Sequence, residues 1–396
     1  MKRWPTKLLG ELCDVEGGNA APQGDENFKD GTIPFVRMKD LGRYHFTNSL
    51  TETADKLTKD SAIANRMKLF EPGCILFPRS GSVALNHRAI LGIRACIVSH
   101  IGVLQNLRPE ISPGFLYLYL TTFDMTSLSK KTTGVDSIAF HDVKKIPVPV
   151  PPLAEQERIV KLLDDADELR KLRAQADRRA ATLIPSLFHE MFGDPATNSK
   201  AWPVRPAGEL MEACDYGTSQ KANEEGRGVP VLRMGNVTTE GQLGLEDLKT
   251  VELAENELAK QRLQAGDVLF NRTNSRELVG KTGMWDGRFE AVAASYFIRV
   301  RFRADVEHPQ HFTTFMNLPF MKRRLAQMAR GAVGQANINS KELKSIPVPV
   351  PPLPLQSEFA QRVAEIRELE AAQATSRTRL DALFQSMLHH AFNEEL

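Results

Sequence analysis

Several signatures of membrane insertion and of secretion are missing from this sequence of 396 residues. No apolar run approaches the ~18–20 residues needed to cross a bilayer, and no apolar signal core follows the opening Met-Lys-Arg-Trp-Pro. The sequence contains four cysteines, and none belongs to a Cys-x-x-Cys pair. These absences predict a cytoplasmic protein whose thiols are reduced.

The usual motifs for metals and nucleotides are missing as well. Nine histidines form neither a His-x-x-x-His nor a His-Glu-x-x-His pattern, so we expect no metal site. No Gly-x-x-x-x-Gly-Lys-Ser/Thr loop is present, which argues against ATP hydrolysis. No glycine-rich turn between a strand and a helix is present either, and such a turn is the usual site for S-adenosylmethionine. We therefore expect this chain to bind no cofactor and to be no enzyme.

Net charge is also small, because 51 basic and 49 acidic residues leave 51 − 49 = +2. The charge is unevenly distributed, however. Residues 1–145 and 193–345 are net basic, whereas residues 146–192 and 346–396 are net acidic. A basic surface favours a polyanionic partner, so this distribution is a weak indication of nucleic-acid binding by the two larger segments.

What the sequence does contain is an internal repeat. Ile146-Pro-Val-Pro-Val-Pro-Pro-Leu153 recurs identically at residues 346–353, an offset of 346 − 146 = 200. Shorter matches keep the same order in both halves: Trp4-Pro5 and Trp202-Pro203, Gly10-Glu11-Leu12 and Gly208-Glu209-Leu210, Pro34–Met38 and Pro230–Met234, Gly73–Phe77 and Gly266–Phe270. This period is far too long for a solenoid. It indicates two copies of one large unit, although a duplicated fold without shared function remains an alternative.

Each copy begins with about 145 residues of mixed α+β character. Short apolar runs after turn residues predict strands at 73–78, 95–100, 266–270 and 293–302. Segments 115–120 and 310–329 have helical character. The proline run then forces extended backbone and ends the globular part.

A long helix follows each proline run. In the first helix we assign Ile159, Ala166, Ala180 and Leu187 to one heptad series, and Leu162, Leu169, Ala176 and Leu183 to the other. Pro185 should kink this helix near its end. Narrow apolar stripes need a partner, so we expect the two helices to pair antiparallel as a coiled coil. The alternative is that each helix packs only on its own globular domain.

These features together resemble the specificity subunits of type I restriction-modification systems. The resemblance covers the whole chain and rests on the Ile-Pro-x-Pro-x-Pro-Pro-Leu run with Glu155-Gln156 after its first copy, the early Gly-Glu-Leu stretches with nearby Cys-Asp, and the tail that begins at Leu383. The second copy departs slightly, with Pro-Leu-Gln-Ser at 354–357.

The resemblance implies an α+β chain with two pseudo-symmetric target recognition domains, at 1–145 and 193–345, separated by an antiparallel pair of long spacer helices, at 146–192 and 346–396. It implies recognition of a bipartite asymmetric DNA site. Two modification subunits would methylate adenine with S-adenosylmethionine, and restriction subunits would use ATP and Mg²⁺. No membrane is involved.

Most candidate DNA contacts come from four polar loops, at 79–83, 130–134, 272–276 and 330–337, and Arg37 and Arg233 occupy equivalent places after a proline-containing strand. Specific binding needs cations for phosphates and fork donors, amides or hydroxyls for base edges. In the first copy they are Arg37, Lys39, Arg79, Ser80, Ser82, Lys130, Lys131 and Thr133. In the second copy they are Arg233, Asn236, Arg272, Asn274, Arg276, Lys281, Arg330, Gln335 and Asn337. For each single residue, a purely structural role is an equal alternative.

Two rival functions stay open. Asn317-Leu-Pro-Phe320 resembles the motif with which adenine methyltransferases hold the target base, so a stand-alone adenine DNA methyltransferase is the main alternative. The motif has no counterpart in the first copy, and its surroundings favour a kinked amphipathic helix. A pure coiled-coil scaffold would leave the two large globular segments unexplained.

Overall fold

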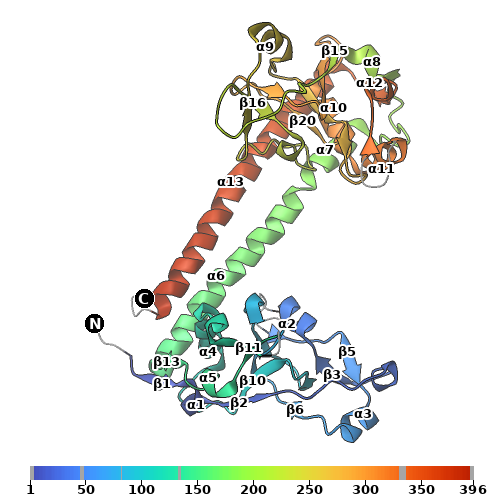
Figure 1. The fold of residues 1–396 in the computed structure, drawn as a ribbon. Helices are drawn as coiled ribbons and strands as arrows, with labels where there is room; N and C mark the ends of the chain where they lie inside the picture. The colour runs from blue at the N-terminus through green and yellow to red at the C-terminus, as the bar shows by residue number, and fades with distance from the viewer. Residues whose placement is uncertain (1–3, 45–48, 82, 133–134, 330–335, 393–396) are drawn as a thin grey trace. The chain divides into compact units, whose positions relative to one another are not determined.

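The computed structural model describes residues 4–44, 49–81, 83–132, 135–329 and 336–392 (Figure 1). The chain divides into two compact units. Unit 1 comprises Met1–Arg173 together with Ser376–Leu396, and unit 2 comprises Ala174–Thr375. Each unit therefore contains one globular domain and a stretch of both long helices.

The globular domain of unit 1 is built on two sheets. The first has the order β2 (Asp14–Gly17), β10 (Ile101–Gln105), β7 (Ile75–Pro78), β8 (Ala89–Leu91), β4 (Ser49–Leu50). The second has the order β5 (Asp55–Leu57), β3 (Ile33–Val36), β9 (Ala95–Ile97), β6 (Leu69–Phe70). A hairpin pairs β11 (Ser129–Thr132) with β12 (Val135–Ile138). The helices are α1 (Leu9–Leu12), α2 (Met38–Tyr44), α3 (Lys59–Ala64), α4 (Pro113–Thr122) and α5 (Phe140–Val143).

Unit 2 repeats this plan. One sheet has the order β15 (Met211–Tyr216), β22 (Phe297–Phe302), β18 (Val268–Asn271), β20 (Thr282–Met284), and another has the order β17 (Lys249–Val251), β16 (Val229–Leu232), β21 (Val292–Ala293). The pair β19 (Thr273–Asn274) and β23 (Ala336–Asn337) corresponds to the bridge between Ser80 and Ser137 in unit 1. The helices are α8 (Ala207–Leu210), α9 (Glu255–Gln261), α10 (Pro309–Asn317), α11 (Pro319–Met328) and α12 (Ser340–Lys344).

A central strand separates two cores in the first domain. Side chains of β7 alternate, so Ile75 and Phe77 face one apolar cluster while Leu76 faces the other. In unit 2, Val268 and Phe270 of β18 face one cluster and Leu269 the other. Burial on both faces explains why these segments are continuously apolar, and it confirms the strands expected at 73–78 and 266–270.

The proline runs form edge strands, as their missing donors require. β13 (Pro147–Pro149) pairs antiparallel with β1 (Thr6–Leu8), and β24 (Pro347–Pro349) pairs with β14 (Val204–Pro206). The Val150 N–H donates to Pro5 O at 2.8 Å, and Val350 donates to Pro203 at the same distance. Only every second residue of such a strand needs a donor on the paired side, so proline is tolerated at the others.

A buried glutamine joins each proline run to its globular domain. Gln156 is fully buried, and its amide accepts from Ser112 N and donates to Glu110 O and Pro151 O, each at 2.8 Å. Gln356 makes the equivalent bonds to His308 N (2.7 Å), Val306 O (3.3 Å) and Pro351 O (2.8 Å). All six partners are main-chain atoms, so this clamp is independent of the side chains around it.

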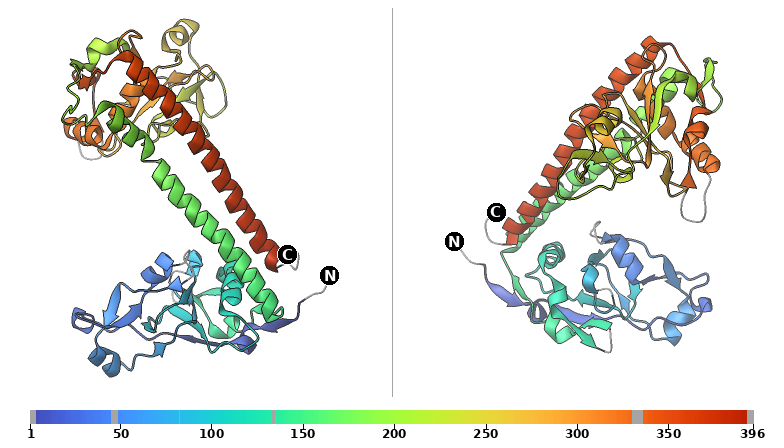
Figure 2. Two further views of the ribbon diagram at one scale, coloured as in Figure 1. Left: turned by 180° about the vertical axis from the view of Figure 1, so that it is seen from behind. Right: turned by 45° about the horizontal axis from the view of Figure 1, so that its top comes forward.

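The long helices are α6 (Leu153–Ala180), α7 (Leu183–Phe192) and α13 (Leu353–Phe392). They pair antiparallel within each unit. In unit 1, Arg170 Nε lies 2.7 Å from Asp381 Oδ1, and Arg173 Nη2 donates to Ser376 Oγ at 3.1 Å. Both views in Figure 2 show the end of α13 beside the start of α6, in agreement with a cluster that contains Ile159, Leu163 and Ala391.

One heptad series of the first helix was predicted wrongly. The inward positions include Leu163 and Ile184, whereas Leu169 and Leu183 are exposed. The inward face is therefore i, i+4, i+7, and Arg170 stands in the seam where a leucine was expected. Arg170 fits there because its guanidinium lies 4.6 Å from the Phe384 ring and pairs with Asp167 and Asp381.

The expected break near Pro185 is confirmed. α6 ends at Ala180 and α7 begins at Leu183. Proline cannot donate to the carbonyl four residues earlier, and its ring collides with that carbonyl, so the helix opens around Ala181. The Ser186 N–H bonds Thr182 O at 3.0 Å and restarts the ladder.

The expected fold class, α+β with two related globular domains and an antiparallel pair of long helices, is confirmed. The segment limits 1–145, 146–192, 193–345 and 346–396 remain a prediction. In the described parts of the chain, no helix is both long enough and apolar enough to cross a membrane.

Candidate nucleic-acid interface

The structure brings two of the predicted loops together in the first domain. The segment that follows β7 runs beside the β11–β12 hairpin. Ser80 forms an antiparallel β-bridge with Ser137, and the Gly81 N–H donates to Asp136 O at 3.1 Å. The Ile138 N–H donates to Arg79 O at 2.8 Å. Arg79 and the lysine-bearing hairpin, 50 residues further on, therefore belong to one surface.

Arg79 is held at this surface by an aromatic ring. Its guanidinium carbon lies 4.5 Å from the centre of the Phe140 ring, at the start of α5. The neighbouring Ser80 Oγ lies 2.7 Å from His100 Nδ1. Among the described residues no carboxylate lies within ion-pair distance of Arg79. The guanidinium therefore keeps donors that can bind an external anion or a base edge.

The second domain repeats this arrangement. Strand β19, directly after Arg272, pairs with β23, so residues 273–274 lie beside residues 336–337. The Arg272 guanidinium carbon lies 4.7 Å from the Tyr216 ring. Tyr216 Oη bonds both the hydroxyl and the main-chain N–H of Ser340 at 3.2 Å. These bonds, followed by the nearby Arg272 charge, lower the pKa of Tyr216. In the described part of unit 2, no carboxylate pairs with Arg272.

Arg37 and Arg233 have a different environment. The Arg37 guanidinium carbon lies 4.9 Å from the centre of the Phe28 ring and 5.2 Å from that of Phe35, and its Nε is 2.5 Å from Asp55 Oδ2. Arg233 Nη2 lies 3.0 Å from Asp247 Oδ2. Both arginines follow the equivalent strands β3 and β16, and both are neutralised by an aspartate. They are thus less available to DNA than Arg79 and Arg272.

Two predicted contact residues are buried inside the second domain. The Asn236 amide accepts from Arg233 N at 2.8 Å and donates to Gly244 O at 2.9 Å. Lys281 Nζ donates to Met234 O at 2.9 Å, and burial lowers the pKa of this lysine. Both side chains have structural partners, so neither is included in the contact set proposed below.

The remaining predicted residues fall into two groups. Lys39 (3.2 Å from Asp55) is exposed in α2, and Lys130 (3.1 Å from Asp142), Asn274 and Arg276 lie at least partly exposed in the loops described above. Asn337 lies on β23, and its Oδ1 is buried without a hydrogen-bond partner among the described residues. Ser82, Thr133, Arg330 and Gln335 lie outside the described residues, and of Lys131 only the backbone, in β11, is described.

Sequence reasoning missed the aromatic residues of this surface. Phe140, Tyr216, Tyr296 and His100 all border the two unpaired arginines. Tyr216 and Tyr296 are 40% and 42% exposed, and the Arg272 N–H donates to Tyr296 O at 2.9 Å. Exposed tyrosine is common at binding surfaces because its ring stacks while its hydroxyl bonds water or ligand. The sequence alone could not separate these rings from core aromatics.

The methyltransferase-like motif connects two elements of the second domain. Asn317 of the methyltransferase-like motif ends α10, and its amide is bonded to Thr282 O (2.6 Å), Thr282 N (3.2 Å) and Thr313 O (2.9 Å). Its donors and acceptor thus fasten β20 to α10, and the expected kink follows at Pro319. In the described part of the chain, no group of three His, Cys, Asp or Glu residues could hold a metal ion.

Comparison with known families agrees with the two-copy architecture. A family model described as the type I restriction modification DNA specificity domain matches residues 1–177 and, separately, residues 199–375. The chain belongs to this family. Each match covers one copy of the repeat, so this specificity subunit of a type I restriction-modification system carries the family domain twice.

Relatives and solved structures extend over nearly the whole specificity subunit. The specificity subunit of type I restriction enzyme EcoKI from Escherichia coli (strain K12) is 28% identical over 402 residues, covering 93% of this chain and 83% of that protein. The StySPI specificity subunit from Salmonella potsdam is 24% identical, with the same coverage of both chains. The crystal structure of the S subunit from M. genitalium has a TM-score of 0.57 at 16% identity, covering 98% and 96% of the two chains. A chain from a study of complex assembly and conformational transition of the type I R-M system has a TM-score of 0.64 at 20% identity, covering 100% and 99%. These likenesses show a shared fold.

Proposed function

We propose that this specificity subunit recognises a bipartite, asymmetric DNA site, with one half-site bound by each globular domain. The observation that carries the proposal is the repeated pair of cations, Arg79 and Arg272, each resting on an aromatic ring without a carboxylate partner in the described residues. A symmetric dimer presents the same surface twice and binds palindromes, whereas two diverged copies can bind unrelated half-sites. In the first copy Lys39, Ser80, Ser82, Lys130, Lys131 and Thr133 complete the proposed surface; in the second, Asn274, Arg276, Arg330, Gln335 and Asn337 do so.

We further propose that the subunit directs partner enzymes and carries out no catalysis itself. Two modification subunits would methylate adenine with S-adenosylmethionine, and restriction subunits would use ATP and Mg²⁺ for translocation and cleavage. The complex would act in the cytoplasm. The bonded amide of Asn317 supports this division, because it is occupied by the main chain of β20.

The modification subunits would dock on the long helices. In unit 1, Leu169 and Leu383 are 54% and 53% exposed; in unit 2, the equivalent Leu369 and Leu183 are 50% and 42% exposed. Each leucine of unit 1 lies 200 residues from its counterpart, since 369 − 169 and 383 − 183 both equal 200. Equivalent exposed leucines on two units fit two copies of one partner.

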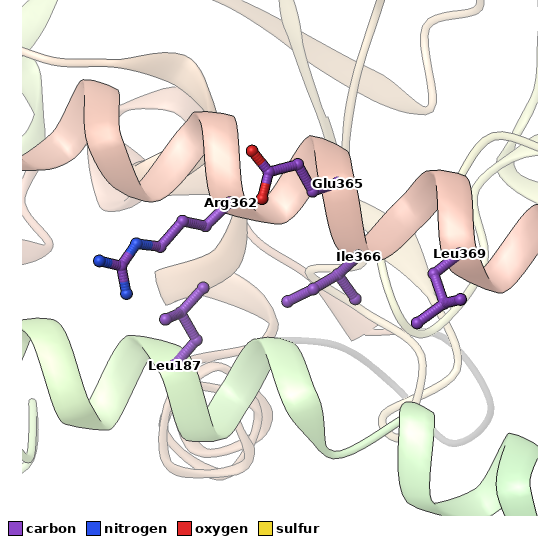
Figure 3. Close-up of a pocket in the computed structure, with 5 residues that line it drawn as sticks. All are labelled: Leu187, Arg362, Glu365, Ile366 and Leu369. Carbon is purple, nitrogen blue, oxygen red and sulfur yellow. The ribbon is translucent and has the colours of Figure 1, made fainter.

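A groove in unit 2 adds to this surface. Figure 3 shows the side chains of Leu187 from α7 and of Ile366 and Leu369 from α13 projecting into the space between the helices, with Arg362 and Glu365 at the margin. An apolar floor with a charged rim is typical of a protein-binding site.

Methylome sequencing of cells with and without the gene tests the proposed function. We expect loss of adenine methylation at a single motif with two specific parts and a nonspecific gap. A continuous motif, or an unchanged methylome, would contradict the proposal. Exchange of residues 1–145 for those of a relative should change only one half of the motif.

The methyltransferase alternative has its own test. The purified chain with S-adenosylmethionine and substrate DNA should transfer no methyl group until modification subunits are added. Transfer by the chain alone would favour the alternative. For docking, Leu169→Glu and Leu369→Glu should each reduce the number of bound modification subunits from two to one in native mass spectrometry. Gln175→Glu, which adds the same charge at an exposed helix position, is the control.

A further inference from the structure

We propose that Phe140 and Tyr216 are positioning residues that hold the DNA-binding arginine of their domains, and that the two copies supply this ring from exchanged positions. The inference rests on the proposed function, because it requires Arg79 and Arg272 to contact DNA. It adds two residues that touch no reacting group and yet determine how each half-site is bound.

Strand register establishes that Gly17 and Tyr216 are equivalent. Gly17 of β2 pairs with Gly102 of β10, and Tyr216 of β15 pairs with Ile298 of β22. Those partners pair in turn with Phe77 and Phe270, the matching residues of the central strands. The first copy therefore has no side chain where the second has the tyrosine ring.

The second position that can supply the ring is 140 in the first copy and 340 in the second. Phe140 begins α5 and Ser340 begins α12. Each residue precedes the isoleucine of its proline run by six positions, since 146 − 140 = 346 − 340 = 6. The first copy thus combines glycine with phenylalanine, and the second combines tyrosine with serine.

Steric contact explains why only one of the two positions carries a ring. A Cβ atom added to Gly17 would lie 3.0 Å from Phe140 Cζ and 3.7 Å from Arg79 Nη1. A side chain at position 17 and a ring at position 140 would therefore compete for one site beside the arginine. In the second copy Ser340 is small, and it bonds the tyrosine hydroxyl at 3.2 Å. The ring moved between positions, while its contact with arginine was kept at 4.5 and 4.7 Å.

This contact has a direct consequence for recognition. A ring below the guanidinium plane attracts the cation and restricts its rotamers, while the N–H groups at the edge of the plane stay available. An arginine ordered before binding loses less conformational entropy when it meets phosphate or guanine. The ring should thus contribute to affinity only through the arginine that it supports.

The experiment uses the full chain assembled with its modification subunits and duplexes that carry its methylated motif. We expect Phe140→Ser to weaken binding about three- to tenfold and Phe140→Tyr to preserve it. Gly17→Tyr alone should weaken binding, because its ring meets Phe140. The double variant Gly17→Tyr with Phe140→Ser copies the second domain and should restore affinity to within about twofold. If the double variant binds DNA as weakly as Phe140→Ser alone, the proposed exchange of ring positions is wrong.

A double-mutant cycle separates positioning from general stability. In the Arg79→Ala background, Phe140→Ser should have no further effect, and its loss should be confined to one half-site. If Phe140→Ser lowers the expression of folded protein, Phe140→Leu keeps the apolar volume without the ring and should show the same loss. An additive effect in the cycle would refute the inference. If Arg79→Ala leaves affinity unchanged, the proposed contact of Arg79 with DNA is refuted. If Arg79→Ala weakens binding while Phe140→Ser and Phe140→Leu bind normally, only the positioning role of Phe140 is refuted.

Discussion

At the junction between helix and domain, unit 1 packs the ring of Phe115 against Phe392 with centroids 5.3 Å apart. The equivalent position in unit 2 is His311. Phe115 lies three residues after Ser112, whose N–H bonds Gln156, and His311 lies three residues after His308, whose N–H bonds Gln356. His311 stacks on Phe188 at 5.4 Å and lies 2.6 Å from the Glu307 carboxylate. An apolar contact in one copy is thus a buried polar pair in the other.

The comparison teaches which contacts a duplicated fold must keep. Gln156 and Gln356 bond only main-chain atoms, whose positions are common to both copies, so the residue type is the same. Gly10 and Gly208 are retained for a similar reason, because an added Cβ would lie 2.9 and 3.0 Å from the Cβ of Lys144 and Lys344. Side chains that touch only other side chains can be replaced in pairs, since volume and polarity can be compensated locally.

The largest expected effect comes from converting the second junction into the first. His311→Phe should destabilise unit 2 by about 3–5 kcal/mol, because it leaves the buried Glu307 carboxylate without its partner. Adding Glu307→Ile reproduces the Ile111 and Phe115 pair of unit 1 and should recover most of that loss. Urea unfolding of the three chains measures both steps, and a double variant no better than the single one would show that the copies are not interchangeable here.

Loss of the buried glutamine should lower the free energy of unfolding slightly less than the His311 substitution, and by the same amount in both copies. Gln156→Leu and Gln356→Leu each leave one buried N–H and two carbonyls unpaired, for about 3 kcal/mol. Hydrogen exchange should locate the damage in unit 1 for the first variant and in unit 2 for the second. Unequal losses would mean that the two clamps differ despite their matching bonds.

Loss of Arg79 or Arg272 should affect DNA binding and leave stability nearly unchanged. Arg79→Ala and Arg272→Ala should each weaken binding by about 2 kcal/mol, or roughly thirtyfold, because a bidentate contact is lost. Each loss should concern only one half-site when the base pairs of the motif are substituted one at a time. Arg43→Ala and Arg288→Ala remove the same charge from exposed ion pairs and serve as controls. If the test and control variants weaken DNA binding equally, the effect is due to the loss of net positive charge and not to a specific contact.

Per pH unit the smallest effect is that of pH itself, and it distinguishes the fully buried Arg88 of unit 1 from the half-buried Lys322 of unit 2. Burial, followed by the nearby Lys281 charge, lowers the pKa of Lys322 in unit 2 to about 7, with Glu240 opposing the shift. In unit 1, burial lowers the pKa of Arg88 only to about 10. Between pH 7 and 10.5 the unfolded chain binds a proton at Lys322 that the folded unit 2 does not. The stability of unit 2 should therefore rise with pH in that window, by at most about 1.4 kcal/mol per pH unit.

Lys322→Met tests this slope. The variant cannot take up the proton, so its free energy of unfolding should exceed that of the parent at pH 7 and converge with it at higher pH. Unfolding can be followed through tryptophan fluorescence, because Trp202 and the buried Trp285 belong to unit 2. Parallel pH curves for parent and variant would rule out Lys322 as the cause.

Sequence patterns were most informative where the chemistry is local. Prolines at 147 and 347 define the edge strands, and Pro185 defines the helix break, since each acts through its own ring. The first heptad was partly wrong because Leu169 and Leu183 lie outside the seam while Arg170 lies inside it. Aspartates that neutralise Arg37 and Arg233 come from strands and loops 14–18 residues away, and the ring under Arg79 comes from α5. Such contacts depend on how strands return to one another, which residue spacing does not encode.

The division of the chain also determines the order in which its parts can form during synthesis. Every residue of unit 2 lies within Ala174–Thr375, whereas unit 1 includes Ala391 and Phe392 beside residues of α4 and α6. On a ribosome, the first domain to emerge is consequently the last whose core can close, because its final apolar side chains are translated after unit 2 is finished. Until then, the exposed face of Phe115 should be the natural binding site for a chaperone.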